Sequence, residues 1–220
     1  MSNSYNIYNF IVVYIVMISE DIIGGLLQPF GITLSQPQIG SLIVYLNLLL
    51  RWNEKINLTA IRTPQECVTR HFGESLLLAC HEQLTGSLLD IGSGAGFPAL
   101  ALKLVFPELN VTLLEPVAKK RAFLKEVVRV CAFSGVEVRG ERLQDLKKEN
   151  LYDTITMRAV GSGLVKEAVP YLKPLGKVYL WLSKAQAKEL VEMGSGLEWD
   201  SAIEIPESRE RIILPGSLKV

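Results

Sequence analysis

The sequence predicts an α/β fold: a doubly wound, mostly parallel seven-stranded sheet with an N-terminal helical lobe. Three observations support this prediction. From residue 87 onward, short apolar runs alternate with amphipathic stretches, a pattern typical of strand–helix–strand units. A glycine-rich turn follows the first apolar run, at the place where open parallel sheets bind ligands. Before residue 85, the apolar residues recur at helical spacing.

The first residues of the chain allow three interpretations. Residues 10–18 are apolar, but they are too few to cross a bilayer, and no positive charge precedes them as in a signal peptide. They could form a short extra helix or strand, or a weak interfacial anchor. We favour a third interpretation, in which residues 1–16 are a non-native or mobile extension and Met17 begins the native chain with an amphipathic segment. Residues 17–84 then form the helical lobe and residues 85–220 the ligand-binding domain, together one compact unit.

Two long helices are expected in the lobe. The first covers residues 35–55, with Ser35 as N-cap and Gln38 at the capping-box position. The second begins at Pro64 and runs to about residue 81. It contains His71, which we expect to be packed and hydrogen-bonded, with RNA contact as the less favoured alternative.

The sheet follows from residue 87 on. Strands are predicted over residues 87–91, 111–115, 136–139, 154–158 and 177–182, and helices over residues 97–106, 117–133, 164–172 and 185–193. Residues 203–205 and 211–214 flank a short turn, which predicts an antiparallel hairpin at one edge of the sheet.

Charge is balanced over the 220 residues but unevenly distributed. Lys and Arg number 23 and so do Asp and Glu, so the chain lacks the strong basic excess of many nucleic-acid-binding proteins. However, no Lys or Arg precedes Arg51, and residues 119–129 hold five basic residues against one acidic. The candidate contacts to nucleic-acid phosphates are Arg51, Lys55, Arg62, Arg70, Lys119, Lys120, Arg121 and Lys125. The alternative for residues 119–129 is an ordinary solvated helix face.

Cysteine and histidine are scarce. The three Cys residues show no CxxC spacing and the chain has two His, so neither a disulfide framework nor a metal site is expected. This composition suits a reducing, cytoplasmic location, and no membrane association is expected.

The glycine-rich turn is the most informative segment. Gly92, Gly94 and Gly96 follow Asp90, in G-x-G-x-G spacing rather than the G-x-G-x-x-G of dinucleotide sites. Glu115 ends the next strand, 23 residues after Gly92, where a carboxylate can accept both hydroxyls of a ribose. An acid at the loop suits the cationic S-adenosylmethionine (SAM) better than an anionic pyrophosphate. The segment therefore favours SAM over NAD or a turn without ligand.

A set of motifs in fixed order resembles one known family. Residues 90–98 (DIGSGAGFP) are similar to the cofactor loop of the bacterial 16S rRNA guanine-N7 methyltransferases, RsmG or GidB. Residues 52–53 and 57–61, Arg70-His71 with residues 74–76, residues 113–124 and Arg158-Ala159 resemble further motifs of that family, and the resemblance extends from about Met17 to the C-terminus. It implies a Rossmann-like class I SAM-dependent methyltransferase, with 16S rRNA or the small ribosomal subunit as partner.

The resemblance also implies the cofactor-binding residues. Together with the loop analysis, it gives Asp90, Gly92, Gly94, Gly96, Phe97, Glu115, Leu143, Gln144 and Arg158. For Arg158 we expect the carboxylate of the cofactor or an RNA phosphate, with an ordinary ion pair to Asp153 or Glu115 as the alternative. The chain departs from the family at Ala99, where Gly is usual, and at Gln144, where an acid is usual, which puts recognition of the adenine amine by Gln144 in doubt.

The sequence lacks the catalytic motifs of two kinds of base methyltransferase, and this indicates which base atom is methylated. No Cys lies in the Pro-Cys context of cytosine-C5 enzymes, and the site of the (N/D)PP(Y/F) loop of amine methylases reads MRAV, residues 157–160. Guanine N7 needs neither apparatus, because its lone pair is nucleophilic at neutral pH, so no catalytic residue is assigned. A small-molecule SAM methyltransferase, an NAD-linked oxidoreductase and a non-catalytic SAM- or RNA-binding module are the alternatives. A monomer is expected, and free rRNA and an assembled particle remain equally open as substrate.

Overall fold

The computed structural model describes residues 18–149, 151–159, 161 and 163–218. The expectations for residues 1–16 and for Met17 fall outside these described residues.

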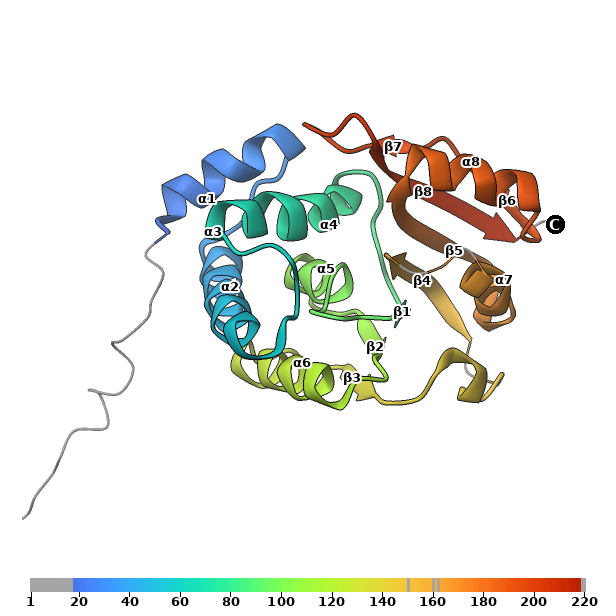
Figure 1. The fold of residues 1–220 in the computed structure, drawn as a ribbon, viewed down its shortest axis with the longest axis horizontal. Helices are drawn as coiled ribbons and strands as arrows, with labels where there is room; N and C mark the ends of the chain where they lie inside the picture. Colours follow the sequence, from blue (N-terminus) through green and yellow to red (C-terminus); the bar gives the residue numbers. More distant parts are fainter. Residues whose placement is uncertain (1–17, 150, 160, 162, 219–220) are drawn as a thin grey trace, which may run out of the picture.

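The N-terminal lobe consists of helices (Figure 1). Ser35 caps the longest of them, and its backbone N–H donates to Gln38 Oε1 at 2.8 Å, so the predicted capping box is present. The predicted second helix is one continuous helical segment whose middle is π-helical, a form that often occurs at functional sites. The elements are α1 (Glu20–Leu27), η2 (Gln28–Phe30), α2 (Gln36–Ile56), α3 (Pro64–Glu66), the π-helical η3 (Cys67–Gly73), α4 (Glu74–Leu76) and η4 (Leu77–Cys80).

The sheet has eight strands within the described residues, in the order β3-β2-β1-β4-β5-β8-β6, with β7 also paired to β8. Strands β3 to β5 in this order are parallel, and β8, β6 and β7 are antiparallel to their neighbours. The order reverses between β1 and β4, which is the place where doubly wound sheets bind ligands. The strands are β1 (Ser87–Ile91), β2 (Asn110–Leu114), β3 (Val136–Arg139), β4 (Tyr152–Arg158), β5 (Leu172–Ser183), β6 (Leu197–Trp199), β7 (Ile203–Glu204) and β8 (Arg211–Leu218).

The mostly parallel sheet and the β7–β8 hairpin are as predicted, but the count of seven strands is wrong. The additional strand is β6, which pairs Leu197 to Trp199 with the end of β8. Strand β6 follows Gly194 and Gly196 and has three residues, too few to show an alternating pattern, so no local sequence signal marks it.

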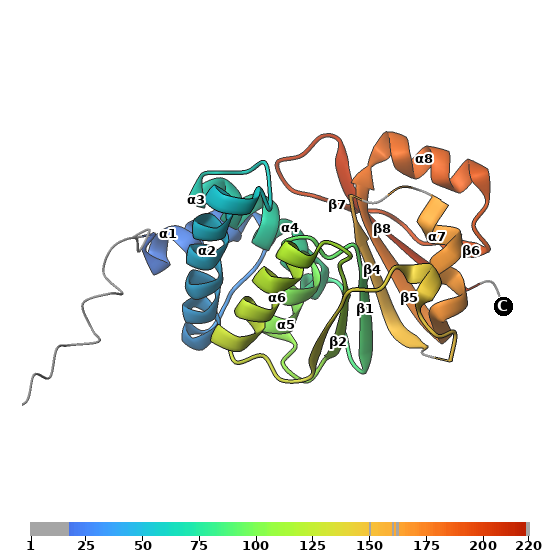
Figure 2. The same ribbon diagram turned by 60° about the horizontal axis from the view of Figure 1, so that its bottom comes forward.

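Helices cover both faces of the sheet (Figure 2). On one face lie α5 (Ala99–Val105) and α6 (Ala118–Val130) with the lobe, and their side chains form a single core cluster that includes Leu42, Tyr45 and Phe72 of the lobe. On the other face lie α7 (Gly163–Ala168) and α8 (Lys184–Met193), with the 3₁₀ turns η5 (Leu143–Asp145) and η6 (Val169–Tyr171). The lobe therefore shares its core with the sheet.

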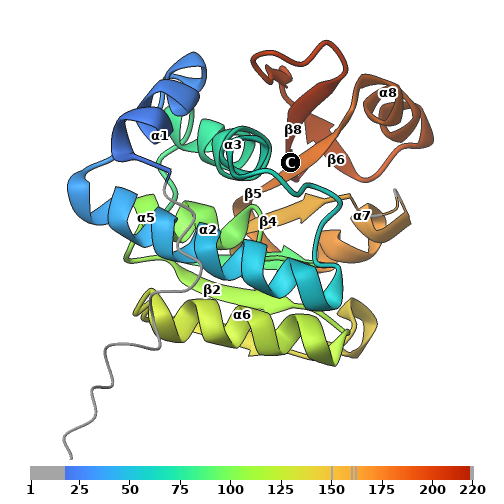
Figure 3. The same cartoon turned by 60° about the vertical axis from the view of Figure 1, so that its left-hand side comes forward.

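Helices α2 and α6 lie side by side and run in opposite directions (Figure 3). The Trp52 ring contacts the Phe123 ring at a centroid distance of 5.8 Å, and Cys131 Sγ donates to the Ser41 carbonyl at 3.7 Å. The last turn of α2 thus lies beside the first turn of α6, which follows the carboxyl end of β2.

Candidate functional site

The glycine loop leaves β1 at the carboxyl edge of the sheet. Gly92, Gly94 and Gly96 have φ angles of 73°, 54° and 90°, a region that favours glycine. The N–H groups of Gly92 and Ser93 both donate to the Leu114 carbonyl, at 2.9 and 3.0 Å, and so hold the loop against the end of β2.

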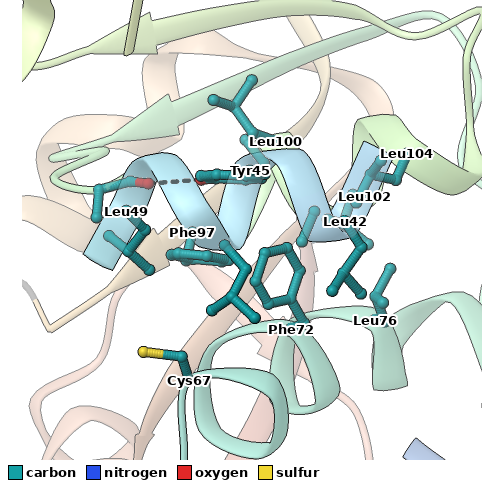
Figure 4. Packing of buried hydrophobic residues seen from close by; sticks show 14 of the residues in the cluster. Leu42, Tyr45, Leu49, Cys67, Phe72, Leu76, Phe97, Leu100, Leu102 and Leu104 are labelled. Carbon is teal, nitrogen blue, oxygen red and sulfur yellow. Dashed lines mark hydrogen bonds between the residues drawn. The ribbon is translucent and has the colours of Figure 1, made fainter. Parts of the chain in front are cut away.

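Aromatic side chains of the lobe pack against the end of this loop, at residues 95–97 (Figure 4). The Phe97 ring stacks on Tyr45 at a centroid distance of 5.1 Å and on His71 at 4.8 Å, with Phe72 edge-on at 5.0 Å. The Tyr45 hydroxyl donates to the Ala95 carbonyl at 2.5 Å. The Phe97 ring is buried in this stack. A ligand could therefore contact Phe97 through its backbone atoms but not through its ring.

Glu115 follows β2 and is buried beneath the loop. Its Oε2 accepts the Gly94 N–H and its Oε1 accepts the Val117 N–H, both at 2.8 Å. Each carboxylate oxygen has a second lone pair. The side chain is thus held in one orientation and still has acceptor capacity for two hydroxyl groups.

Asp90 is a buried carboxyl with one oxygen unpaired. Its Oδ1 accepts the Thr156 hydroxyl at 2.7 Å, whereas Oδ2 has no hydrogen-bond partner. Burial raises the pKa of Asp90 to about 6, with a smaller contribution from the charge of Glu115, while the Thr156 hydroxyl opposes the shift. An unpaired buried acceptor with a raised pKa is a site for a cationic N–H donor.

A hollow of about 210 Å³ adjoins the loop and Glu115. The predicted Gly92, Leu143 and Gln144 line it, and sequence reasoning missed the other lining residues. Ile91 and Leu114 could have been found, since they end the strands next to Gly92 and Glu115, but Leu164 carries no sequence signal. The full lining is Ile91, Gly92, Leu114, Pro116, Arg142, Leu143, Gln144 and Leu164. These mostly apolar walls suit a flat aromatic ring.

Arg158 ends β4 and is engaged with the lobe. Its Nη2 lies 2.8 Å from Glu74 Oε2 and donates to the Arg70 carbonyl at 2.7 Å. Glu74 also pairs with Arg211 at 2.8 Å. Neither ion-pair partner considered from the sequence is used, because Asp153 pairs with Lys173 and Glu115 bonds backbone N–H groups. The alternative partners Asp153 and Glu115 are therefore wrong, and Glu74 takes their place.

His71 lies between this network and the loop. Its Nε2 is 2.9 Å from Thr59 Oγ1, while Nδ1 is buried without a hydrogen-bond partner. Burial, together with the charges of Arg158 and Arg70, lowers the pKa of His71 to about 3, so its ring is neutral. It is the packed, hydrogen-bonded histidine that the sequence favoured.

The predicted RNA-contact residues fall into two groups. Lys119, Lys120 and Lys125 on α6, with Arg51 and Lys55 on the adjoining half of α2, make no ion pair among the described residues. The other three are engaged: Arg62 donates to Asn57 at 3.2 Å, Arg70 pairs with Glu66 at 2.9 Å, and Arg121 donates to the carbonyls of Glu115 and Pro116.

None of the helices within residues 18–149, 151–159, 161 and 163–218 combines the length and the hydrophobicity that a membrane span requires. The same part of the chain contains no group of three or more His, Cys, Asp or Glu side chains arranged to hold a metal ion.

These features fit SAM. The unpaired Oδ2 of Asp90 can take the ammonium, Glu115 can take the ribose hydroxyls, and the apolar hollow can take the adenine. With the doubly wound sheet and its loop at the strand-order reversal, they define a class I SAM-dependent methyltransferase.

Comparison with known proteins gives the family. The family model of GidB, rRNA small subunit methyltransferase G, matches residues 38–206. The protein of that name from Leuconostoc mesenteroides is 34% identical over 214 residues, covering 90% of this chain and 89% of the relative. The one from Lactococcus lactis is 36% identical over 204 residues, covering 85% of each. The chain belongs to the rRNA small subunit methyltransferase G family.

Solved structures agree on the fold. The glycopeptide N-methyltransferase MtfA with sinefungin aligns with a TM-score of 0.58 at 12% identity, covering 68% of this chain and 87% of that one. The ribosomal protein L11 methylase of Lactobacillus delbrueckii also aligns with a TM-score of 0.58, at 16% identity, covering 69% of this chain and 79% of that one.

Proposed function

We propose that this enzyme transfers the methyl group of SAM to N7 of a guanine in 16S rRNA. The observation that carries the proposal is a three-part cofactor site, Asp90, Glu115 and the apolar hollow, in a member of this family. The decisive experiment maps 7-methylguanine in 16S rRNA from cells with and without the gene. An unchanged modification pattern would contradict the proposal.

The geometry of the site supports a specific set of proposed cofactor contacts. Asp90 accepts the ammonium and Glu115 the ribose hydroxyls, while Leu143 and Gln144 lie along the adenine. Gly92, Gly94 and Gly96 allow the backbone to approach the ligand without a Cβ in the way. Phe97 contributes its backbone, and Arg158, which Glu74 holds at the end of β4, places positive charge near Asp90.

The chemistry requires alignment rather than proton removal. SAM supplies a methyl carbon on a sulfonium, and the N7 lone pair takes it while the sulfur keeps the bonding electron pair. Burial raises the pKa values of Cys67 and Cys131 to about 11, so these thiols stay protonated and unreactive. Holding the two reactants in line can supply roughly 7–11 kcal/mol of the barrier.

Asp90 makes cofactor binding depend on pH. A carboxyl whose pKa is raised in the folded protein stabilises the fold below its unfolded value of 3.8, and this contribution is lost as the pH rises through about 6. An ammonium requires the ionised form, so we expect SAM affinity at pH 5 to be about tenfold below its plateau above pH 7. Calorimetric titration between pH 5 and 8 measures this.

Two variants test whether Asp90 is the group responsible for that pH dependence. Asp90→Asn should flatten the profile and lower the plateau. Thr156→Val removes the hydroxyl that favours the carboxylate and should move the midpoint to higher pH. A midpoint that stays in place in both variants would remove Asp90 from this role.

We propose that the unpaired basic residues of α2 and α6 bind rRNA phosphates. Lys119 and Lys120 lie in the first turn of α6, three and four residues after Pro116 of the cofactor hollow. Because each phosphate contact releases counterions, replacing both by Gln should reduce the slope of log affinity against log salt by about 1.4. Filter binding of small subunits at several salt concentrations checks this. Arg129→Gln, at the other end of α6, is the control and should leave the slope unchanged.

We further propose that residues 17–84 and 85–220 act as one unit, as a cytoplasmic monomer that needs no metal. The shared core of lobe and sheet supports the single unit. Light scattering of the purified protein and activity after chelation test the monomer and the metal independence.

A further inference from the structure

A second cavity lies at the carboxyl ends of β4 and β5, between α7 and α8. Its volume is about 240 Å³, whereas one water needs roughly 15 Å³. None of the predicted cofactor or RNA-contact residues lines it. The cavity therefore offers space for a ligand in a place that the roles assigned so far leave unused.

The cavity is a neighbour of the cofactor hollow. Met157 of β4 lines the cavity and is in register with Ile91 of β1, which lines the hollow. Along α7, Leu164 faces the hollow and the next residue, Val165, faces the cavity. A ligand in the cavity would thus lie next to a ligand in the hollow.

The lining indicates a flat, uncharged ligand. Its walls combine apolar side chains, among them Met157, Leu180 and Leu190, with an almost equal polar surface, and no Lys or Arg contributes. A phosphate would find no cation here. A nucleobase removed from its helical stack would find apolar contacts on its faces.

Two polar side chains of α8 face the cavity, Gln186 and Glu189, three residues apart and so on the same side of the helix. The Ser183 N–H donates to Gln186 Oε1 at 2.9 Å, which commits the oxygen and leaves the Nε2 amide as a free donor. Glu189 makes no ion pair or side-chain hydrogen bond within the described residues, so both carboxylate oxygens can accept.

We propose that this cavity binds the target guanine, with Gln186 donating to O6 and Glu189 accepting from N1–H and the 2-amino group. This inference rests on the proposed function and names the residues that select its substrate. Guanine presents an acceptor and two donors along this edge, which complements the donor and the two acceptors of α8. Adenine presents a donor and an acceptor in the opposite order and is mismatched. With this edge held, N7 stays free to receive the methyl group.

Glu189 then also acts on the reaction. When the N7–C bond forms and the C–S bond breaks, the electron pair stays on sulfur and the positive charge passes to the base, with no proton lost in this step. The Glu189 carboxylate, hydrogen-bonded to N1–H, interacts more strongly with the base as it becomes positively charged than with the neutral base before the reaction. Interactions that strengthen in the transition state raise kcat.

The test compares Glu189→Gln with Glu192→Gln. Both residues are exposed on the same helix, and of the two Glu189 alone lines the cavity. Small subunits from cells lacking this methylation are the substrate. We expect Glu189→Gln to lower kcat/KM by roughly tenfold to a hundredfold, with SAM affinity and Tm unchanged, and Glu192→Gln to match the wild type. Gln186→Glu keeps the capping acceptor but places an acceptor against O6, so it should also lower kcat/KM.

A base analogue distinguishes a loss of guanine recognition from a loss of the protein fold. Inosine lacks the 2-amino group, so small subunits reconstituted with inosine at the mapped position should react several-fold more slowly with wild-type enzyme. Glu189→Gln should lose that preference. If wild-type enzyme forms no 7-methylguanine, the proposed function itself fails. If it does, but Glu189→Gln retains both full activity and the preference for guanine, only the guanine cavity is refuted.

Discussion

Gly96→Ala should abolish detectable SAM binding and lower the free energy of unfolding by about 2–5 kcal/mol. At φ 90°, a residue with a Cβ is strained, and the added Cβ would lie 2.4 Å from the Tyr45 hydroxyl oxygen and 2.8 Å from Leu100 Cδ1. Tyr45 cannot move aside, because its ring is stacked on Phe97 and its hydroxyl is bonded to Ala95. Urea denaturation and calorimetric titration with SAM measure the two effects.

A second substitution and a control sharpen this experiment. Tyr45→Phe in the Gly96→Ala background removes the clashing oxygen but not the strained φ, so it should restore part of the lost stability. Gly40→Ala, within α2 and with no atom within 4 Å of the added Cβ, should stabilise the protein by about 0.5–1 kcal/mol. Normal SAM affinity in Gly96→Ala would show that the shape of the loop end does not matter for binding.

Glu74→Gln should be the other strongly destabilising substitution and should lower the free energy of unfolding by about 3 kcal/mol. The Glu74 side chain is 3% exposed and binds two guanidinium groups, Arg158 at 2.8 Å and Arg211 at 2.8 Å. Arg158, 18% exposed, would lose its carboxylate partner, whereas Arg211 is 39% exposed and can turn toward water, which limits the cost. Urea denaturation measures the change.

Glu66→Gln is the matched control. Glu66 forms an ion pair with a single arginine, Arg70, at 2.9 Å. Unlike Glu74, it lies at the surface, because both side chains of this pair are more than two-fifths exposed. Such surface pairs contribute at most about 1 kcal/mol. Equal losses for Glu66→Gln and Glu74→Gln would contradict the central role of the buried carboxylate.

Local signals made most of the fold predictable. The capping box of Ser35 and Gln38 marked the start of α2, and β1 and β3 have the predicted limits, because their apolar runs are bounded by turn residues. Strand β6 escaped because pairing with β8, rather than its own three residues, makes it a strand. At the site, Asp90, the glycines and Glu115 were predictable from their spacing along the chain.

The remainder of the site depends on contacts between distant residues. Arg158 and Glu74 are 84 positions apart, and nothing near either residue indicates the other. The same holds for the stacking of Tyr45 on Phe97, which joins two segments that sequence reasoning treated separately. The cavity of Gln186 and Glu189 also escaped, because a helix with two polar residues on one side is usually just solvated.

The stack of Tyr45, Phe97 and His71 ties the cofactor loop to the N-terminal lobe. Its outer rings come from the lobe and its middle ring from the sheet domain, and the Tyr45 hydroxyl completes the loop by bonding the Ala95 carbonyl. A lobe exchanged for that of another methyltransferase would leave the loop without two of its three rings and one of its hydrogen bonds. Lobe and loop therefore depend on each other for their shape, whereas the α7–α8 side of the sheet, where no ring of this stack lies, is free of this constraint.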